Sequence, residues 1–325
     1  MRVCITGGTG FLGRALVRRL LDEGFAVRVL ARPSRRADEL ETWGAQVVRG
    51  ELADAESVMH AVKGADIVYH AGAKVEPPGS KTEFLETNVG GTERVLTASL
   101  QQGVSRVIYV SSLAVYGPVL NGRRIDEGTP LDEAPQLRDF YSHSKILADE
   151  FASSFARKTG LPVVIIRPGV VYGPSKPLPL GLLGFRLGKT NIVFGNRNRR
   201  VPLNYLENLI DAVQLASRHK GERLQQFNVV DDDDLTLAQY HQTRTEVEKK
   251  PALFFPGWPL LLAAPFAQAV MHVLPRGGNG FSQYHLRRAL QERWYDTHRI
   301  RQETGWTPKV QLREALQLTL RPIYG

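Results

Sequence analysis

Tyr141 and Lys145 are the residues of this sequence whose types and spacing best suit proton transfer. They are four positions apart in a predicted helix over 141–157, so they share one face of it. A free tyrosine, with a pKa near ~10, is a poor base at neutral pH, but a nearby ammonium favours the phenolate and lowers that pKa. The pair can then move a proton to or from a substrate oxygen. Taken alone, the same spacing is that of an ordinary amphipathic helix.

A second feature is the serine pair Ser111-Ser112, which ends a predicted strand over 106–110. A serine hydroxyl at that strand end can hydrogen-bond the same substrate oxygen. Serine, tyrosine and lysine together predict a reductase-type site. The late histidines, such as His272 and His285, show no metal-ligand spacing, so no metal is expected.

These residues need a cofactor site, and the start of the chain predicts one. An apolar strand over 1–5 runs into a glycine-rich turn over 6–13, and a helix begins near residue 11. Strand, glycine turn and helix in this order are typical of dinucleotide binding, with the pyrophosphate at the helix amino end. The predicted contacts in the turn are Gly7, Thr9, Gly10, Phe11, Leu12 and Gly13.

The second strand, over 25–30, ends in Ala31-Arg32-Pro33-Ser34-Arg35-Arg36. An acidic residue near this point binds the ribose 2′-hydroxyl in NAD-specific units, and none is present here. Arginine suits a 2′-phosphate, because guanidinium and phosphate pair bidentately. Arg32, Ser34 and Arg35 therefore favour NADP(H) over NAD(H), although a solvated basic loop would have the same composition.

Strands and helices alternate as far as residue 173, which predicts an α/β fold with a Rossmann-type, doubly wound parallel sheet. Beyond that point the alternation stops, and we expect a smaller, mostly helical C-terminal substrate lobe. The predicted dinucleotide-binding domain spans 1–175, with 201–230 returning to it, and the substrate lobe spans 176–200 and 231–325.

Composition narrows the class of protein. The chain has 325 residues, 42% of them hydrophobic, a net charge of +9 and one cysteine, Cys4, which predicts a reducing, cytoplasmic location. The basic residues form no stripe with aromatics, so nucleic acid is disfavoured. Four prolines interrupt the apolar segment 251–274, so no transmembrane span is expected. We expect residues 253–274 to form or flank an apolar wall of the pocket; peripheral membrane contact and a homodimer stay open.

Six motifs together resemble the extended short-chain dehydrogenases/reductases, the superfamily of NAD-dependent epimerases and dehydratases. They are the glycine turn, His70-Ala71-Gly72-Ala73-Lys74, Asn88-Val89-Gly90-Gly91-Thr92, Val110 to Gly117, Tyr141 to Lys145, and Arg167 to Pro174. The resemblance implies Tyr141 as acid/base, Lys145 as its partner on the nicotinamide ribose, and Ser112 as the donor to the substrate oxygen. The further cofactor contacts expected are Glu51, Leu52, Ala71, Gly72, Ala73, Lys74, Asn88, Ser111 and Pro168.

The second half resembles the branch of 3-beta-hydroxysteroid dehydrogenases/isomerases and dihydroflavonol reductases, through Trp294-Tyr295-Asp296 and Thr304 to Pro308. Two departures are Glu51, where the family usually has Asp, and Asn204 to Asn208, where a Val-Asp-Asn run is usual. The expected function is NAD(P)-dependent interconversion of a secondary alcohol and a ketone on an apolar or amphipathic small molecule. The alternative is a nucleotide-sugar epimerase or dehydratase, for which Arg186, Lys189, Arg197, Arg199 and Arg200 could hold a diphosphate.

Overall fold

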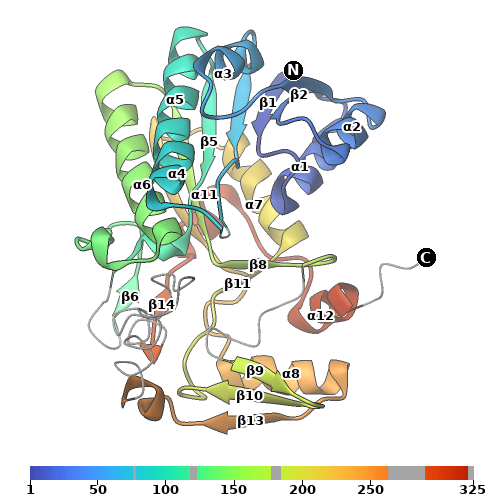
Figure 1. Cartoon of the computed structure of the whole chain (residues 1–325), viewed down its shortest axis with the longest axis vertical. Coiled ribbons are helices and arrows are strands. Elements are labelled where there is room, and N and C mark those ends of the chain that lie inside the picture. The colour runs from blue at the N-terminus through green and yellow to red at the C-terminus, as the bar shows by residue number, and fades with distance from the viewer. Residues whose placement is uncertain (76–77, 118–122, 177–183, 263–289, 321–325) are drawn as a thin grey trace.

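The computed structural model describes residues 1–75, 78–117, 123–176, 184–262 and 290–320 (Figure 1). Its centre is a sheet of seven parallel strands in the order β12-β7-β5-β4-β1-β2-β3. The strand bounds are β1 Arg2–Thr6, β2 Ala26–Ala31, β3 Gln46–Arg49, β4 Ile67–His70, β5 Arg106–Val110, β7 Val163–Pro168 and β12 Leu224–Val229. The predicted Rossmann-type, doubly wound sheet is confirmed.

Helices cover both faces of this sheet (Figure 1). One apolar core lies under α1, α2, α7 and α11, and the other under α3, α5 and α6. Because both faces are buried, the central strands β4, β5 and β7 are largely apolar rather than alternating. The helix bounds are α1 Phe11–Asp22, α2 Arg35–Thr42, α3 Ala55–Val62, α4 Lys81–Leu85, α5 Gly91–Gln101, α6 Phe140–Thr159, α7 Leu206–Arg218 and α11 His298–Thr304.

The register of the sheet puts the predicted ligand-binding turns side by side. Thr6, the last residue of β1, aligns with His70, the last residue of β4. In the sheet β1 lies between β2 and β4, so the direction in which successive strands are added reverses at β1. Ligands of open α/β sheets bind at the carboxyl ends of the strands at such a reversal. The glycine turn and the segment 71–74 both leave the sheet at this point.

The C-terminal lobe packs around its own core and carries helices α8 (Leu237–Glu248) and α12 (Leu312–Leu320). It also contains a three-stranded sheet, β13-β10-β9, that the sequence pattern did not predict; it lies beside α8 at the far end of the molecule in Figure 1. Its strands are β9 Gly184–Leu187, β10 Thr190–Phe194 and β13 Ala252–Phe255.

The remaining elements of the chain are short. Two two-stranded sheets pair β8 with β11 and β6 with β14. The remaining bounds are β6 Arg124–Ile125, β8 Val170–Tyr172, β11 Leu203–Tyr205, β14 Trp294–Tyr295, the π-helical η1 Glu86–Gly90, and the short helices η2 Leu113–Val115 and η3 Pro135–Leu137.

The apolar segment expected to line the pocket is described only as far as residue 262. Within it, Leu253 and Phe255 lie on β13 and are half exposed, and Trp258 is 62% exposed. Residues 263–274 lie outside the described residues. No helix in the described ranges is both long enough and apolar enough to cross a lipid bilayer.

Candidate functional site

Two glycines of the turn after β1 leave no room for a side chain. Gly7 has φ +76°, and a Cβ there would lie 2.5 Å from the amide nitrogen of Gly72. A Cβ on Gly13 would lie 2.0 Å from the carbonyl oxygen of Gly7. Both positions therefore require glycine, for the tight turn and for the close packing of α1 that the sequence predicted.

The amino end of α1 is suited to a phosphate group. Its N-cap residue, Gly10, provides no side-chain cap, and the first turn contains no acidic residue. A Cβ on Gly10 would meet one neighbouring atom, the Gly7 carbonyl oxygen at 3.2 Å. The first-turn N–H groups and the positive end of the helix dipole suit an anion. This turn, which includes Thr9, Phe11 and Leu12, therefore fits the pyrophosphate of a dinucleotide.

At the end of β2, Arg32 and Arg35 are exposed, and no ion pair engages either side chain within the described ranges. Ser34 is the N-cap of α2, where its hydroxyl accepts a hydrogen bond from the amide of Ala37 at 3.3 Å. Of the acids of α2 nearest this turn, Asp38 forms an ion pair with Arg49 at 2.9 Å and Glu39 with Arg14 at 2.6 Å. Of the predicted 2′-phosphate residues, Ser34 is therefore engaged as a helix cap, whereas Arg32 and Arg35 form no ion pair with the described residues.

Leu52 lies between two glycines of neighbouring segments. A Cβ on Gly72 would lie 2.9 Å from Leu52 Cδ1, and a Cβ on Gly91 would lie 3.0 Å from Leu52 Cβ. This close packing explains the glycine at position 91, the first residue of α5 after the π-helical η1. Glu51 beside Leu52 is exposed.

Asn88 connects the loop after β4 to the first turn of α6. Its side-chain oxygen accepts from the Lys74 amide at 2.7 Å, and its amide nitrogen donates to the Lys74 carbonyl at 2.9 Å and to Ser144 Oγ at 2.8 Å. Ser144 Oγ donates in turn to the Tyr141 carbonyl at 2.8 Å. Asn88 therefore braces the predicted acid/base helix against a predicted cofactor loop.

Tyr141, Lys145 and Ser112 come together where β5 meets α6. The side chain of Ser112 hydrogen-bonds that of Tyr141. Lys145 lies one helical turn along α6, where its Nζ donates to the Val110 carbonyl at 2.8 Å and stands 4.9 Å from the centre of the Tyr109 ring. These are the groups that a proton transfer to a bound oxygen would need, gathered at one strand end.

The pKa of Tyr141 differs from the sequence-based expectation. Burial raises it to about 12, while the hydrogen bond from Ser112 lowers it and Asp139 raises it. Burial also lowers the pKa of Lys145 to about 8, against the opposing effect of Asp149. The pKa of Tyr141 is therefore raised in the folded protein, not lowered as the sequence predicted, because burial is the largest influence on it.

A buried ion pair that the sequence analysis missed supports this site. Asp149, fully buried one turn beyond Lys145, accepts from Ser111 Oγ at 2.6 Å and from Arg167 Nε and Nη2 at 2.9 and 2.7 Å. Arg167 also donates to the Tyr116 hydroxyl at 2.8 Å. Two signals were available: an acid at the i+8 position of the Tyr141 face, and an arginine at the end of an apolar strand.

The other predicted cofactor residues lie at one edge of the sheet. Ser111 directly follows β5. Its hydroxyl donates to the Asp149 carboxylate, so it is not the serine that contacts Tyr141. Lys74 forms an ion pair with Glu83 at 3.1 Å. The positions at or directly after the carboxyl ends of β4, β5 and β7 are Ala71, Gly72, Ala73, Lys74, Ser111 and Pro168.

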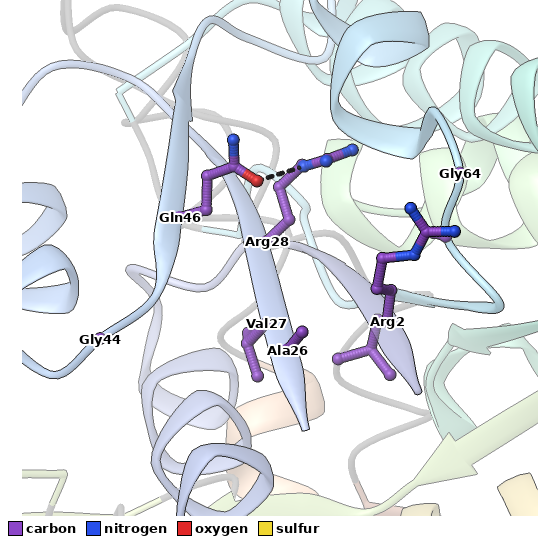
Figure 2. A pocket seen from close by; sticks show the side chains of 9 residues that line it. Arg2, Ala26, Val27, Arg28, Gly44, Gln46 and Gly64 are labelled. Atoms are coloured by element: carbon purple, nitrogen blue, oxygen red, sulfur yellow. Dashed lines mark hydrogen bonds between the residues drawn. The ribbon is translucent and has the colours of Figure 1, made fainter. Parts of the chain in front are cut away.

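A cavity of about 160 Å³ lies at the opposite edge of the sheet, between the amino ends of β1 and β2 (Figure 2). Arg28 projects into it and donates to Gln46 Oε1 at 2.9 Å and to the Lys63 carbonyl after α3 at 2.6 Å. These bonds hold Arg28 in a structural role. The cavity is separated from Tyr141 by the length of the strands and is not part of the candidate site.

Comparison with known proteins agrees with this geometry. The model of the NAD dependent epimerase/dehydratase family matches residues 3–229. The 2-alkyl-3-oxoalkanoate reductase of Stenotrophomonas maltophilia (strain K279a) is 29% identical over 98% of both chains. The 3 beta-hydroxysteroid dehydrogenase/Delta 5-->4-isomerase of Mycobacterium tuberculosis (strain ATCC 25618 / H37Rv) is 32% identical over 67% of this chain and 60% of its own.

Solved structures of nucleotide-sugar enzymes share the fold. The crystal structure of UDP-glucose 4-epimerase with UDP-glucose from Thermotoga maritima superposes with a TM-score of 0.73 over 98% of this chain and 97% of that one, at 22% identity. At that identity the likeness concerns the fold. The family match, the doubly wound sheet and the glycine turn lead to one conclusion: the chain belongs to the NAD dependent epimerase/dehydratase family of extended short-chain dehydrogenases/reductases, enzymes that bind a nicotinamide cofactor.

Proposed function

We propose that this protein interconverts a secondary alcohol and a ketone on an apolar or amphipathic small molecule, with Tyr141 as the acid/base. The observation that carries the proposal is the interaction between the side chains of Ser112 and the partly buried Tyr141, one helical turn from Lys145. A substrate oxygen that met both hydroxyls would be held by Ser112 and would exchange its proton with Tyr141.

The protonation of Tyr141 favours ketone reduction as the reaction of the site. With a pKa of about 12, its hydroxyl carries a proton at neutral pH and can donate it to a carbonyl oxygen. Ser112 stabilises the negative charge that develops on that oxygen, because its hydroxyl donates from a fixed position. When bound, the nicotinamide supplies or accepts the hydride.

NADP(H) is the preferred cofactor in this proposal. Arg32 and Arg35 lie exposed at the end of β2 and pair with no acid in the described part of the chain, and the sequence 31–36 contains no acid to bind a ribose 2′-hydroxyl. The acids of α2 are engaged elsewhere, Asp38 with Arg49 at 2.9 Å and Glu39 with Arg14 at 2.6 Å. Titration of NADPH and NADH into the purified protein tests this preference.

The substrate is expected to combine apolar bulk with a polar group. The names of two relatives, a 2-alkyl-3-oxoalkanoate reductase and a 3 beta-hydroxysteroid dehydrogenase, describe ketones or secondary alcohols on largely apolar molecules. In this proposal residues 1–175 with 201–230 bind the cofactor, and residues 176–200 with 231–325 form the substrate lobe. The exposed apolar side chains of that lobe, among them Phe255 and Trp258, also support peripheral membrane contact, which vesicle co-sedimentation would test.

A nucleotide-sugar epimerase or dehydratase is the weaker candidate. It would need free cationic groups in the lobe for a diphosphate. Arg186 is paired with Glu248 at 3.0 Å, and Arg200 with Asp234 and Glu292, each at 3.2 Å. These pairs would have to break before either arginine could bind a diphosphate.

The test is a substrate screen of the purified protein. NADPH consumption would be followed with alkyl ketones, ketosteroids and UDP-glucose, and each product identified by mass spectrometry. Net oxidation of NADPH with a ketone, and none with UDP-glucose, is the expected result. Conversion of UDP-glucose without net change of cofactor would refute the proposal in favour of an epimerase.

A further inference from the structure

Two arginines are buried beside the loop that carries Ser112. Arg138 is 2% exposed and Arg293 is 7% exposed, and the Nη1 of each donates to the same backbone carbonyl, that of Tyr116, at 3.4 Å. Tyr116 directly follows η2, which begins one residue after Ser112. Both guanidinium groups therefore contact the chain segment that begins at Ser112, four residues after that serine.

Among the residues that the structure describes, only one of these two arginines has a negative partner. Arg138 forms an ion pair with Asp132 at 2.5 Å and donates to the Ala114 carbonyl at 2.7 Å. Arg293 meets only neutral groups in that part of the chain, the Tyr116 carbonyl and the Tyr295 hydroxyl at 3.3 Å. Its Nε and Nη2 are shielded from solvent and make no hydrogen bond to a described residue. A buried guanidinium without a counterion is unfavourable, so this site is one negative charge short.

The unused atoms of Arg293 have a specific shape. Nε and Nη2 form one edge of the guanidinium, with two parallel N–H donors that match the two oxygens of a carboxylate. Arg167 uses the same two nitrogens to hold the Asp149 carboxylate, at 2.9 and 2.7 Å. The Nε–Nη2 edge of Arg293 and its single positive charge therefore match one carboxylate group.

The chain offers few counterions of its own. Of the acids beside Arg293 in sequence, Glu292 is paired with Arg200 and Asp296 with Arg124, each at 3.2 Å. Outside the described residues the sequence contains one acidic side chain, Glu76; the segments 118–122, 177–183 and 263–289 contain none.

We propose that Arg293 binds a carboxylate of the substrate, and that the substrates of this enzyme are therefore hydroxy or oxo carboxylic acids with an apolar chain. This inference rests on the proposed function and gives it a substrate class. The carboxylate would be held bidentately by Nε and Nη2 of Arg293, while the oxygen to be reduced or oxidised meets Ser112 and Tyr141. Arg138, already paired with Asp132, would fix the Tyr116 carbonyl that positions Arg293.

The test compares an acid with its uncharged ester. A 2-alkyl-3-hydroxy acid and its methyl ester are oxidised with NADP⁺ or NAD⁺, and kcat/KM is measured for both. The wild-type enzyme should prefer the acid. Because hydrogen bonds to charged groups are among the stronger ones, Arg293→Met should lower the acid-to-ester ratio about 10- to 100-fold. Arg293→Lys should fall between the two, since lysine keeps the charge but not the paired donors.

Two controls make the result specific. Arg124→Met removes the same charge from β6, where the arginine is 46% exposed, and should leave the ratio near the wild-type value. Glu76→Gln tests an internal counterion: if it reproduces the effect of Arg293→Met, the proposal is overturned. Cofactor binding, followed by NADPH fluorescence, reports whether each variant is folded. If Arg293→Met does not fold, the acid-to-ester ratio of Arg293→Lys is the test of the proposal.

The failures can be told apart. If wild type oxidises both compounds and Arg293→Met leaves their ratio unchanged, the carboxylate site is refuted while the oxidoreductase function stands. If wild type oxidises neither compound nor any other secondary alcohol, the proposed function fails and this inference fails with it.

Discussion

Asp149→Asn is expected to weaken the fold and to move the pH dependence of the reaction. The substitution removes the charge that balances Arg167 inside the protein, where Asp149 is fully buried. Breaking a buried ion pair typically costs about 3–5 kcal/mol, and asparagine keeps the shape and one acceptor oxygen, so we expect about 3 kcal/mol. At about 2–4 °C per kcal/mol, the melting temperature should fall by about 6–12 °C.

The same substitution acts on Lys145. Burial holds the pKa of Lys145 at about 8, and Asp149 is the group that raises it. Without that carboxylate the pKa should fall below 8, so Lys145 loses its proton nearer to neutral pH. If the ammonium form is the active one, the alkaline limb of kcat/KM should move to lower pH in the variant.

The assay is kcat/KM against pH for ketone reduction, with melting temperatures measured on the same samples. Glu150→Gln is the matched control, because Glu150 is the next residue of α6 and is exposed. It should change neither the profile nor the stability appreciably. An Asp149→Asn protein that is folded and destabilised, but keeps the wild-type pH profile, would show that Asp149 is structural only and that our account of Lys145 is wrong.

Four further outcomes are expected. Tyr141→Phe should lower kcat by ~10²–10⁴-fold and keep NADPH binding, because only the proton carrier is lost; near-normal turnover would exclude Tyr141 as acid/base. Arg32→Glu should shift the ratio of dissociation constants from NADPH toward NADH, and tighter NADH binding by wild type would contradict the premise. Gly13→Ala should abolish dinucleotide binding, since its Cβ would lie 2.0 Å from the Gly7 carbonyl oxygen, whereas Gly128→Ala, with 3.5 Å to its nearest neighbour, should not. Burial, aided by Lys145, lowers the pKa of His70 to about 3, so between pH 6.5 and 3 the unfolded wild-type chain binds a proton that the folded chain does not. The free energy of unfolding of the wild type should therefore decrease as the pH drops from 6.5 toward 3. His70→Gln should make this decrease smaller, as measured by urea titrations at each pH.

The parallel sheet was predictable because its signals are local. Each strand is a short apolar run and each helix has its own period, so the order of elements follows directly from the sequence. The small sheet of the lobe was not predictable in this way. It pairs β10 with β13, which are separated by β11, α7, β12 and α8, and such a pairing depends on how the lobe packs rather than on either segment.

The candidate site likewise has features that the sequence predicts and features that only the folded chain determines. The spacing of Tyr141 and Lys145 places them on one helix face whatever surrounds that helix. The two serines after β5 are different, because neighbouring residues of an extended chain point to opposite sides. Ser112 bonds Tyr141 and Ser111 bonds Asp149, and which serine faces which side is decided by the position of α6 across the sheet.

Burial also sets the charge state of Tyr141, the proposed acid/base. The spacing of Tyr141 and Lys145 in the sequence could not reveal this effect. From the sequence, a lysine one turn away should make Tyr141 more acidic; in the folded chain, loss of water raises the Tyr141 pKa to about 12 and lowers that of Lys145 to about 8. Both shifts have one cause, because a buried site disfavours the charged form of each group. The consequence is a tyrosine that holds its proton at neutral pH and a lysine close to losing its own. A protonated tyrosine is the form that would give a proton to a carbonyl oxygen, as the proposed ketone reduction requires.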